Sequence, residues 1–391
     1  MRRGMCSLAL MAAVSAALWA QTAGSLDRGF GQQGFVRTDF KGNDAGSAVA
    51  VQPDGKIVVA GWSDRGTSIF AVARYLADGN LDPAFKGGGV VTEIGVEDRA
   101  WAVALQADGK IVAAGDSAGR IALVRYLPTG ALDSSFDAGG IAIFPLAGPA
   151  ESGRAVAIQP DGKILVAGAS GGSTAVVRVL ANGTPDASFG RQGRGTVDIG
   201  DGPEHASAVV LQRDGRIVVA GEAADRNTYL TALARFTPAG APDPTFGKAG
   251  IATVKFGEAS GAGALLQSPD GSFVTAGYVG GDLAILRFNA DGTYDTKRSR
   301  TVDFGGNTGI GHAIGLQRDG KIVVAGETAG NVLLVRANPD GSLDPGFGNQ
   351  GVVTTDLGGD ENGSALAIQP DGRILVAGKA GGDILLLRYG R

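Results

Sequence analysis

Short stretches of alternating apolar and polar residues recur along almost the whole chain and are separated by turn sequences. One set comprises residues 47–52 (SAVAVQ), 56–61 (KIVVAG), 70–75 (FAVARY) and 89–94 (GVVTEI). Alternation that is rich in Val, Ile and Ala is typical of β-strands packed against a neighbouring layer. Each set therefore predicts four strands and no helix.

The set recurs seven times. Its most regular part is a decapeptide that first appears as QPDGKIVVAG at residues 52–61. The aspartate of this decapeptide marks the period of 49 to 56 residues, at Asp54, Asp108, Asp161, Asp214, Asp270, Asp319 and Asp371. A fixed period of this length indicates a repeat architecture with one supersecondary unit per repeat.

Turn chemistry supports the strand assignment independently of the apolar pattern. In the sequence Pro-Asp-Gly, proline presets the first turn position and glycine accepts a positive φ, so the first two strands of a repeat form a hairpin. A second turn ending in glycine, such as Asp78-Gly79, joins the third and fourth strands in six of the repeats.

The seventh repeat is split between the two ends of the chain. The C-terminal sequence LLLRYGR stops just after a third strand, and SLDRGFGQQGFVRTDF at 25–40 matches a fourth-strand segment with no earlier strands before it. The N-terminal strand can therefore complete the C-terminal unit, which avoids an exposed strand edge at each end. The sequence predicts an all-β, seven-bladed β-propeller of four-stranded blades, whose ring is closed by its N-terminal strand.

Residues 1–23 have the layout of a secretory signal peptide. Arg2 and Arg3 precede an apolar run of about a dozen residues, which is too short to span a membrane, and small residues follow. We therefore expect an exported protein, periplasmic, cell-surface or extracellular, whose residues 24–391 form one propeller domain.

Cysteine content and charge limit the chemistry of the expected mature chain. Cys6 is the only cysteine and lies within the signal segment, so no disulfide, thiol nucleophile or cysteine metal site is expected. Without Arg2 and Arg3 the formal charge falls from −4 to about −6. This balance argues against nucleic acid as a partner, and no membrane span is expected.

Three segments recur in a fixed order: LDxxFGxxG, then AxAVxxQPDGKIVVAG, then xLARYxxDG. Together they resemble the delta-60 repeat family of bacterial β-propellers over nearly all of residues 25–389. The resemblance implies a propeller on an exported or cell-surface protein and implies little about activity. Residues 292–304 (GTYDTKRSRTVDF) depart from the pattern, so we expect an irregular outer strand near residues 297–301.

The polar residues that recur in every repeat are interpreted as structural. An arginine ends each third strand, and in six of the seven cases an aspartate follows eight residues later, as in Arg74 and Asp82. This spacing places the two side chains across a hairpin from each other, within reach of a charge-assisted hydrogen bond. Asp27 can serve Arg388 across the ring closure. A ring of seven blades needs seven such braces, whereas a functional site rarely needs seven copies.

Function is expected where the repeats differ. Chain direction places the variable connections on the face opposite the glycine turns, around the mouth of a central channel. Ser47, Trp101, Arg154, Ser207, Gly263, His312 and Ser364, seven residues before each turn aspartate, should ring this mouth. The candidate ligand-binding residues are Trp62, Trp101, Arg154, His205, Tyr278, His312, Asp44, Asp98, Glu151, Glu204 and Glu361.

These residue types fit a binding or interaction module, with aromatic side chains for stacking and carboxylates as acceptors. The expected partner is a protein, a peptide or a glycan, bound by a monomer without a cofactor. A metal-dependent hydrolase or lyase at the same face is an alternative, although two histidines are few for it and no catalytic or metal-ligand motif is found. A structural cell-envelope protein without a defined ligand site is a second alternative.

Overall fold

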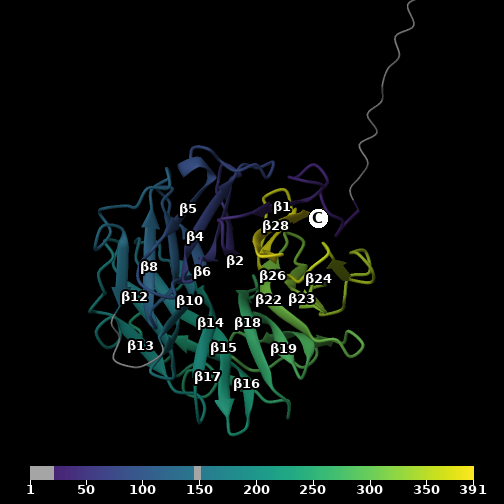
Figure 1. Cartoon of the computed structure of the whole chain (residues 1–391). Coiled ribbons are helices and arrows are strands. Elements are labelled where there is room, and N and C mark those ends of the chain that lie inside the picture. Colours follow the sequence, from purple (N-terminus) through teal and green to yellow (C-terminus); the bar gives the residue numbers. More distant parts are fainter. Residues whose placement is uncertain (1–21, 145–150) are drawn as a thin grey trace, which may run out of the picture.

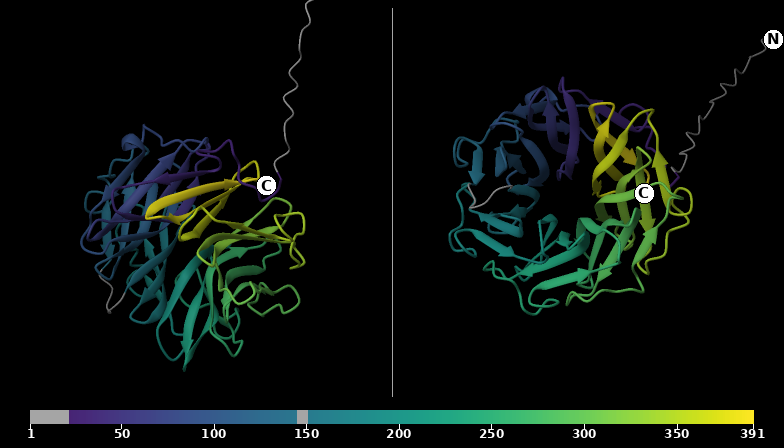
Figure 2. Two further views of the ribbon diagram at one scale, coloured as in Figure 1. Left: turned by 45° about the vertical axis from the view of Figure 1, so that its right-hand side comes forward. Right: turned by 60° about the horizontal axis from the view of Figure 1, so that its bottom comes forward.

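The computed structural model describes residues 22–144 and 151–391. The expected signal peptide therefore lies almost entirely outside the described residues. Within them the chain forms seven four-stranded antiparallel sheets arranged as blades around a central axis (Figures 1 and 2). This confirms the predicted seven-bladed propeller. No helix in the described part of the chain has the length and apolar character needed to cross a membrane.

The strands fall into four tiers from the axis outwards. The innermost strands are β2 (Asn43–Val51), β6 (Arg99–Leu105), β10 (Ser152–Ile158), β14 (Glu204–Leu211), β18 (Ser260–Gln267), β22 (Gly309–Leu316) and β26 (Glu361–Ile368). The second strands are β3 (Ile57–Asp64), β7 (Ile111–Ser117), β11 (Ile164–Ser170), β15 (Ile217–Asp225), β19 (Phe273–Val279), β23 (Ile322–Thr328) and β27 (Ile374–Ala380).

The two outer tiers complete each blade. The third strands are β4 (Ser68–Tyr75), β8 (Arg120–Tyr126), β12 (Ser173–Val179), β16 (Thr228–Phe236), β20 (Asp282–Phe288), β24 (Asn331–Ala337) and β28 (Asp383–Tyr389). The outermost strands are β5 (Gly89–Thr92), β9 (Ile141–Phe144), β13 (Arg194–Val197), β17 (Ile251–Val254), β21 (Arg300–Val302), β25 (Val352–Thr355) and β1 (Phe35–Thr38). A short 3-10 helix, η1 (Lys86–Gly88), precedes β5.

The two ends of the chain meet in one blade. Strand β1 pairs antiparallel with β28, and the sheet order is β1-β28-β27-β26. Figure 1 shows the purple N-terminal strand beside the yellow C-terminal strand. The ring is thus closed by hydrogen bonds between the first and last strands of the fold, which leaves neither strand as a free edge.

The core lies mainly between the blades. The second and third strands are buried on both faces, and their Val, Ile, Leu and Ala side chains pack against those of the adjoining blade. Each blade therefore cannot bury its apolar faces alone, and the seven-part ring is the unit that provides a closed core.

Six of the seven expected arginine–aspartate braces form. Arg125 Nε donates to Asp133 Oδ2 at 2.8 Å, and its Nη1 donates to the carbonyl oxygen of Ala181 in the next blade at 2.5 Å. The guanidinium also lies 4.4 Å from the ring centroid of Phe136. Each brace thus links the third strand to its own outer segment, and five of the six also donate a hydrogen bond to a carbonyl group of the neighbouring blade.

The exception is the blade formed by β18 to β21. There Arg298 occupies the place of the stacked phenylalanine and donates to Asp295 at 2.6 Å, while the Nε of Arg287 is buried without a partner among the described residues. Burial and the nearby Arg298 charge lower the pKa of Arg287. Its outer strand, β21, has three residues where the others have four. The departure expected from the sequence is therefore confirmed.

Replacing Arg298 by phenylalanine is expected to repair this brace. The ring would lie under Arg287, and Asp295 would be released to accept a hydrogen bond from the Arg287 Nε. We expect a gain of about 1 kcal/mol in the free energy of unfolding, measured by urea denaturation. Arg298→Ala is the control, because it removes the same ion pairs without supplying a ring. A phenylalanine variant no more stable than the alanine variant would contradict the repair.

Candidate channel site

Every innermost strand carries a β-bulge at the same position. In β6, Ala100 pairs with Gly115 and Ala102 with Ala114, which leaves Trp101 without a cross-strand partner. A bulge commonly turns the unpaired side chain out of the regular alternation. The seven bulged residues are Ser47, Trp101, Arg154, Ser207, Gly263, His312 and Ser364.

The last glycine of the decapeptide makes this bulge possible. A Cβ atom on Gly115 would overlap the carbonyl oxygen of Arg99 and lie 2.8 Å from its carbonyl carbon and 2.9 Å from the Cα of Ala100. The same overlap with a carbonyl oxygen occurs at all seven positions, Gly61, Gly115, Gly168, Gly221, Gly277, Gly326 and Gly378. An invariant residue of the repeat thus shapes the variable site, a role that the sequence analysis did not assign.

The bulged residues surround the central channel. This channel has a volume of about 560 Å³, and all seven bulged residues line it. The Ala side chains of the same strands, with Val, Leu or Ile side chains next to them, form most of the remaining wall. The residues expected to ring the mouth are therefore brought together there. A larger hollow of about 730 Å³ lies on the opposite face, beside the turns at Asp319 and Asp371.

Trp101 and Arg154 form the most organised part of the channel wall. The indole Nε1 of Trp101 donates to Oδ1 of Asp116, and the Arg154 guanidinium lies 4.3 Å from the centroid of the Trp101 ring. Arg154 Nε is buried and has no acceptor among the residues that the structure describes. Burial lowers the pKa of Arg154, with Asp116 opposing this shift. The channel thus holds a cation whose hydrogen bonding is incomplete.

A second aromatic–guanidinium pair lies between the first two blades. Arg99 lies 5.3 Å from the centroid of Trp62, and its Nε donates to Ser68 Oγ at 3.4 Å. Neither Trp62 nor Arg99 lines the channel. Trp62 is therefore a candidate that the structure places next to the channel rather than in it.

The two histidines each face one glutamate. His205 Nε2 lies 3.6 Å from Glu222, which also accepts a hydrogen bond of 2.9 Å from the hydroxyl of Tyr278. His312 Nε2 lies 3.7 Å from Glu327. Burial lowers the pKa of His205, and the pKa of Glu327 is lowered chiefly by its hydrogen bond to His312.

The histidines do not assemble a metal centre in the described part of the chain. Only one group of three His, Cys, Asp or Glu side chains there has donor atoms close enough together to hold an ion, and it contains neither His205 nor His312. His312 lines the channel and His205 does not. The alternative of a metal-dependent enzyme at the mouth therefore has no group of three donors that includes a histidine among the described residues.

The structure corrects the placement of the five acidic candidates. Asp44, Asp98, Glu151, Glu204 and Glu361 are at most 2% exposed and lie outside the channel lining. Four of them accept hydrogen bonds from backbone amides of the loop that enters their own blade, and Glu151 accepts one of 3.4 Å from the hydroxyl of Ser170. Asp98, for example, accepts from the amides of Ile94 at 2.8 Å and Gly95 at 3.0 Å. Their carboxylates satisfy backbone donors under the connecting loops and are not acceptors for a channel ligand.

Solved structures share this fold. A catalytically inactive virginiamycin B lyase from Staphylococcus aureus, crystallised with quinupristin, is 14% identical, with a TM-score of 0.58, covering 91% of this chain and 99% of that one. YCF48 from Cyanidioschyzon merolae is 13% identical, with a TM-score of 0.52 and coverages of 91% and 98%. YCF48 bound to the D1 peptide is 11% identical, with a TM-score of 0.53 and coverages of 96% and 99%. These identities establish the fold alone.

The repeats themselves match a family of propeller domains. No curated protein shows a significant match to the sequence. The family described as a domain of unknown function (DUF5122) beta-propeller matches seven segments, at residues 52–85, 106–136, 159–189, 212–246, 268–297, 317–347 and 369–390. These segments cover more than half of the chain and include the decapeptide and the third-strand arginine of every blade, so the protein belongs to the DUF5122 beta-propeller family.

Proposed function

We propose that the protein is an exported binding module that takes a peptide segment with an acidic group into the mouth of its central channel. The observation that carries this proposal is the Arg154 guanidinium in the channel wall. It lies over Trp101, and its buried Nε lacks an acceptor among the described residues. A partly buried cation with incomplete hydrogen bonding is stabilised when a carboxylate approaches it.

The rest of the channel fits a short polar segment. Ser47, Ser207 and Ser364 offer hydroxyl groups at the bulges, and the Ala and Val side chains of the same strands form an apolar part of the channel wall. The volume of about 560 Å³ falls within the usual range of ligand pockets, roughly 300 to 1,000 Å³. A guanidinium held on an aromatic ring is a well-suited partner for a carboxylate, because its planar fork can donate two parallel hydrogen bonds.

The fold comparison supports a peptide as the ligand by analogy. YCF48, which shares the fold, has been solved with a bound D1 peptide. Other propellers of this shape are enzymes, as virginiamycin B lyase shows by its name. For this chain we favour binding, because no described group of residues combines a histidine with two further metal donors.

Tryptophan fluorescence provides the test. In a Trp62→Phe background without residues 1–23, Trp101 is the remaining tryptophan and lies in the channel. We expect tetraglutamate to change its emission saturably and tetralysine to leave it unchanged. Arg154→Gln should weaken tetraglutamate binding about 10- to 100-fold, since a charge-assisted hydrogen bond contributes about 1.5 to 3 kcal/mol.

Arg99→Gln is the matched control, because Arg99 also lies over an aromatic ring, that of residue 62, but is outside the channel lining, so its loss should leave the affinity unchanged. Titration with oligogalacturonate separates a glycan ligand from a peptide ligand. If none of the probes binds, or if Arg154→Gln and Arg99→Gln weaken binding equally, this placement of the site is wrong.

A further inference from the structure

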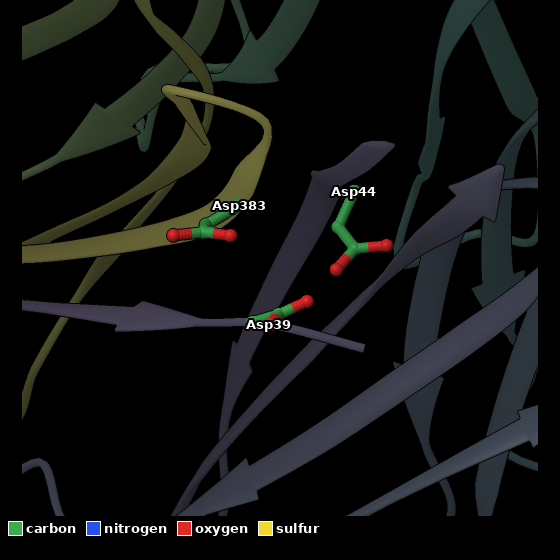
Figure 3. A group of neighbouring side chains, drawn as sticks. All are labelled: Asp39, Asp44 and Asp383. Carbon is green, nitrogen blue, oxygen red and sulfur yellow. The ribbon is translucent and has the colours of Figure 1, made fainter. Parts of the chain in front are cut away.

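Three aspartates meet at the seam where the ring closes. Asp39 follows β1, Asp44 lies near the start of β2, and Asp383 begins β28. Each offers a carboxylate oxygen, and these oxygens all lie within 4.8 Å of one another. Figure 3 shows the three side chains turned toward a common space from three separate backbone segments. The group thus joins the N-terminal strand, the first blade and the last blade.

The Asp44 carboxylate is buried and incompletely bonded. It is fully inaccessible to solvent, and its Oδ2 accepts a hydrogen bond of 2.5 Å from the amide of Phe40. Its Oδ1 is also buried but has no partner among the described residues. In the next blade Asp98 occupies the same position, and there both oxygens accept hydrogen bonds from backbone amides. A buried carboxylate oxygen without a donor is costly, and a nearby cation would offset this cost for Asp44, whereas Asp98 at the next seam has donors for both of its oxygens.

Among the seams in the described part of the chain, this is the only one with an acidic residue at all three corresponding positions. The amide of Asp44 donates to the carbonyl oxygen of Gly382 at 2.6 Å. The corresponding backbone hydrogen bond at other seams identifies the residues that occupy the equivalent positions there. The residues that correspond to Asp383 are Ile69, Arg120, Ser173, Leu230, Asp282 and Asn331. Asp282 alone among them is acidic, and at its seam Gly309 stands in the place of Asp44. The triad is therefore a feature of the closure rather than of the repeat.

Three carboxylates this close together repel one another. Burial, Asp39 and Asp44 all raise the pKa of Asp383, while Arg37 opposes the shift. The donors are all oxygen atoms, and neither nitrogen nor sulfur donors belong to the group. Carboxylate oxygens supplemented by water or carbonyl oxygens are the ligands of hard divalent cations, and flexible loop ligands of this kind suit calcium better than the rigid octahedron of magnesium.

We propose that Asp39, Asp44 and Asp383 bind a calcium ion that fastens the N-terminal strand to the last blade of the ring. The ion neutralises the carboxylates and supplies the missing partner of Asp44. Because the three ligands come from both ends of the chain, calcium stabilises the closed ring and has no comparable site in a ring opened at this seam. This role is separate from ligand binding in the channel.

Thermal unfolding of the full propeller in calcium or EDTA tests the proposal. Calcium chloride should raise the Tm saturably, by about 3 to 6 °C at millimolar concentration, and an equal concentration of magnesium should raise it less. Isothermal titration should show one calcium ion per chain. A Tm that does not respond to calcium would overturn the proposal.

Asp383→Asn gives a sharper result because it removes both a ligand and a repulsive charge. In EDTA this variant should unfold at the same temperature as the unsubstituted protein or at a higher one, and in calcium at a lower one. A merely structural role for Asp383 would not produce this reversal. Asp282→Asn is the matched control, with the same change at the same place in a blade without the triad, and it should keep the full calcium response. A calcium response that survives Asp383→Asn would also overturn the proposal.

Discussion

Replacing Gly115 by alanine should destabilise the protein by about 2 to 4 kcal/mol and displace Trp101 from the channel wall. The added Cβ would overlap the carbonyl oxygen of Arg99, which is a backbone atom and cannot move aside alone. The innermost strand must then abandon its bulge or separate from β7. Urea denaturation measures the free energy of unfolding. Near-ultraviolet circular dichroism and Trp101 emission report the loss of the contacts with Asp116 and Arg154.

Gly281→Ala provides the comparison for this substitution. The nearest atom to a Cβ at Gly281 is the Cγ2 of Thr308, at 3.9 Å, and the backbone there does not require a positive φ. This variant should unfold within about 0.5 kcal/mol of the unsubstituted chain. If Gly115→Ala is equally stable and leaves the Trp101 signal unchanged, the bulge does not depend on glycine, and the proposed origin of the channel site is wrong.

The repeats made most of the fold predictable. Seven copies of the same turn and strand pattern predict seven blades, and the split repeat at the two ends predicts the pairing of β1 with β28. The seven positions that line the channel were also found from sequence, because spacing from the turn aspartate places them at equal depth in every blade. The spacing identifies these positions because every blade packs against its neighbours in the same way.

The acidic candidates show that residues adjacent in sequence can lie in different surroundings. Asp98 immediately precedes Arg99, and Asp98 was expected at the channel mouth. Successive residues of a strand point to opposite faces, so the side chain of Asp98 turns under the loop while Arg99 reaches Trp62. The alternation could have revealed this difference. The bulge could not have been inferred in the same way, because it depends on how the glycine of one strand meets a carbonyl group of another.

The closing triad could not be assembled from sequence at all. Asp39 and Asp383 lie near opposite ends of the chain, and neither belongs to a repeated motif. Only the pairing of β1 with β28 brings the loop after β1 to the start of β28. Similarly, the unpaired Nε of Arg287 follows from the replacement of one stacked phenylalanine by Arg298, an effect visible only once the brace geometry is known.

The brace at the ring closure should be the ion pair on which stability depends most. Arg388 Nε donates to Asp27 Oδ2 at 2.8 Å, and its Nη1 donates to the carbonyl oxygen of Ala77 at 2.5 Å. Arg388 is 5% exposed, and its guanidinium lies 4.4 Å from the ring centroid of Phe30. Asp27 therefore neutralises a nearly buried cation and at the same time holds the N-terminal segment against the last blade.

Asp27→Asn should lower the free energy of unfolding by about 3 kcal/mol, because it leaves the Arg388 charge buried without a counterion. Hydrogen exchange in β1 should accelerate more than exchange in the other outer strands, since the N-terminal segment separates first. Asp295→Asn is the matched control. Its motif position is the same, but Asp295 pairs with the partly exposed Arg298 rather than with Arg287, so the expected loss is below about 1 kcal/mol. Equal losses in the two variants would show that burial of the arginine does not set the contribution of the brace.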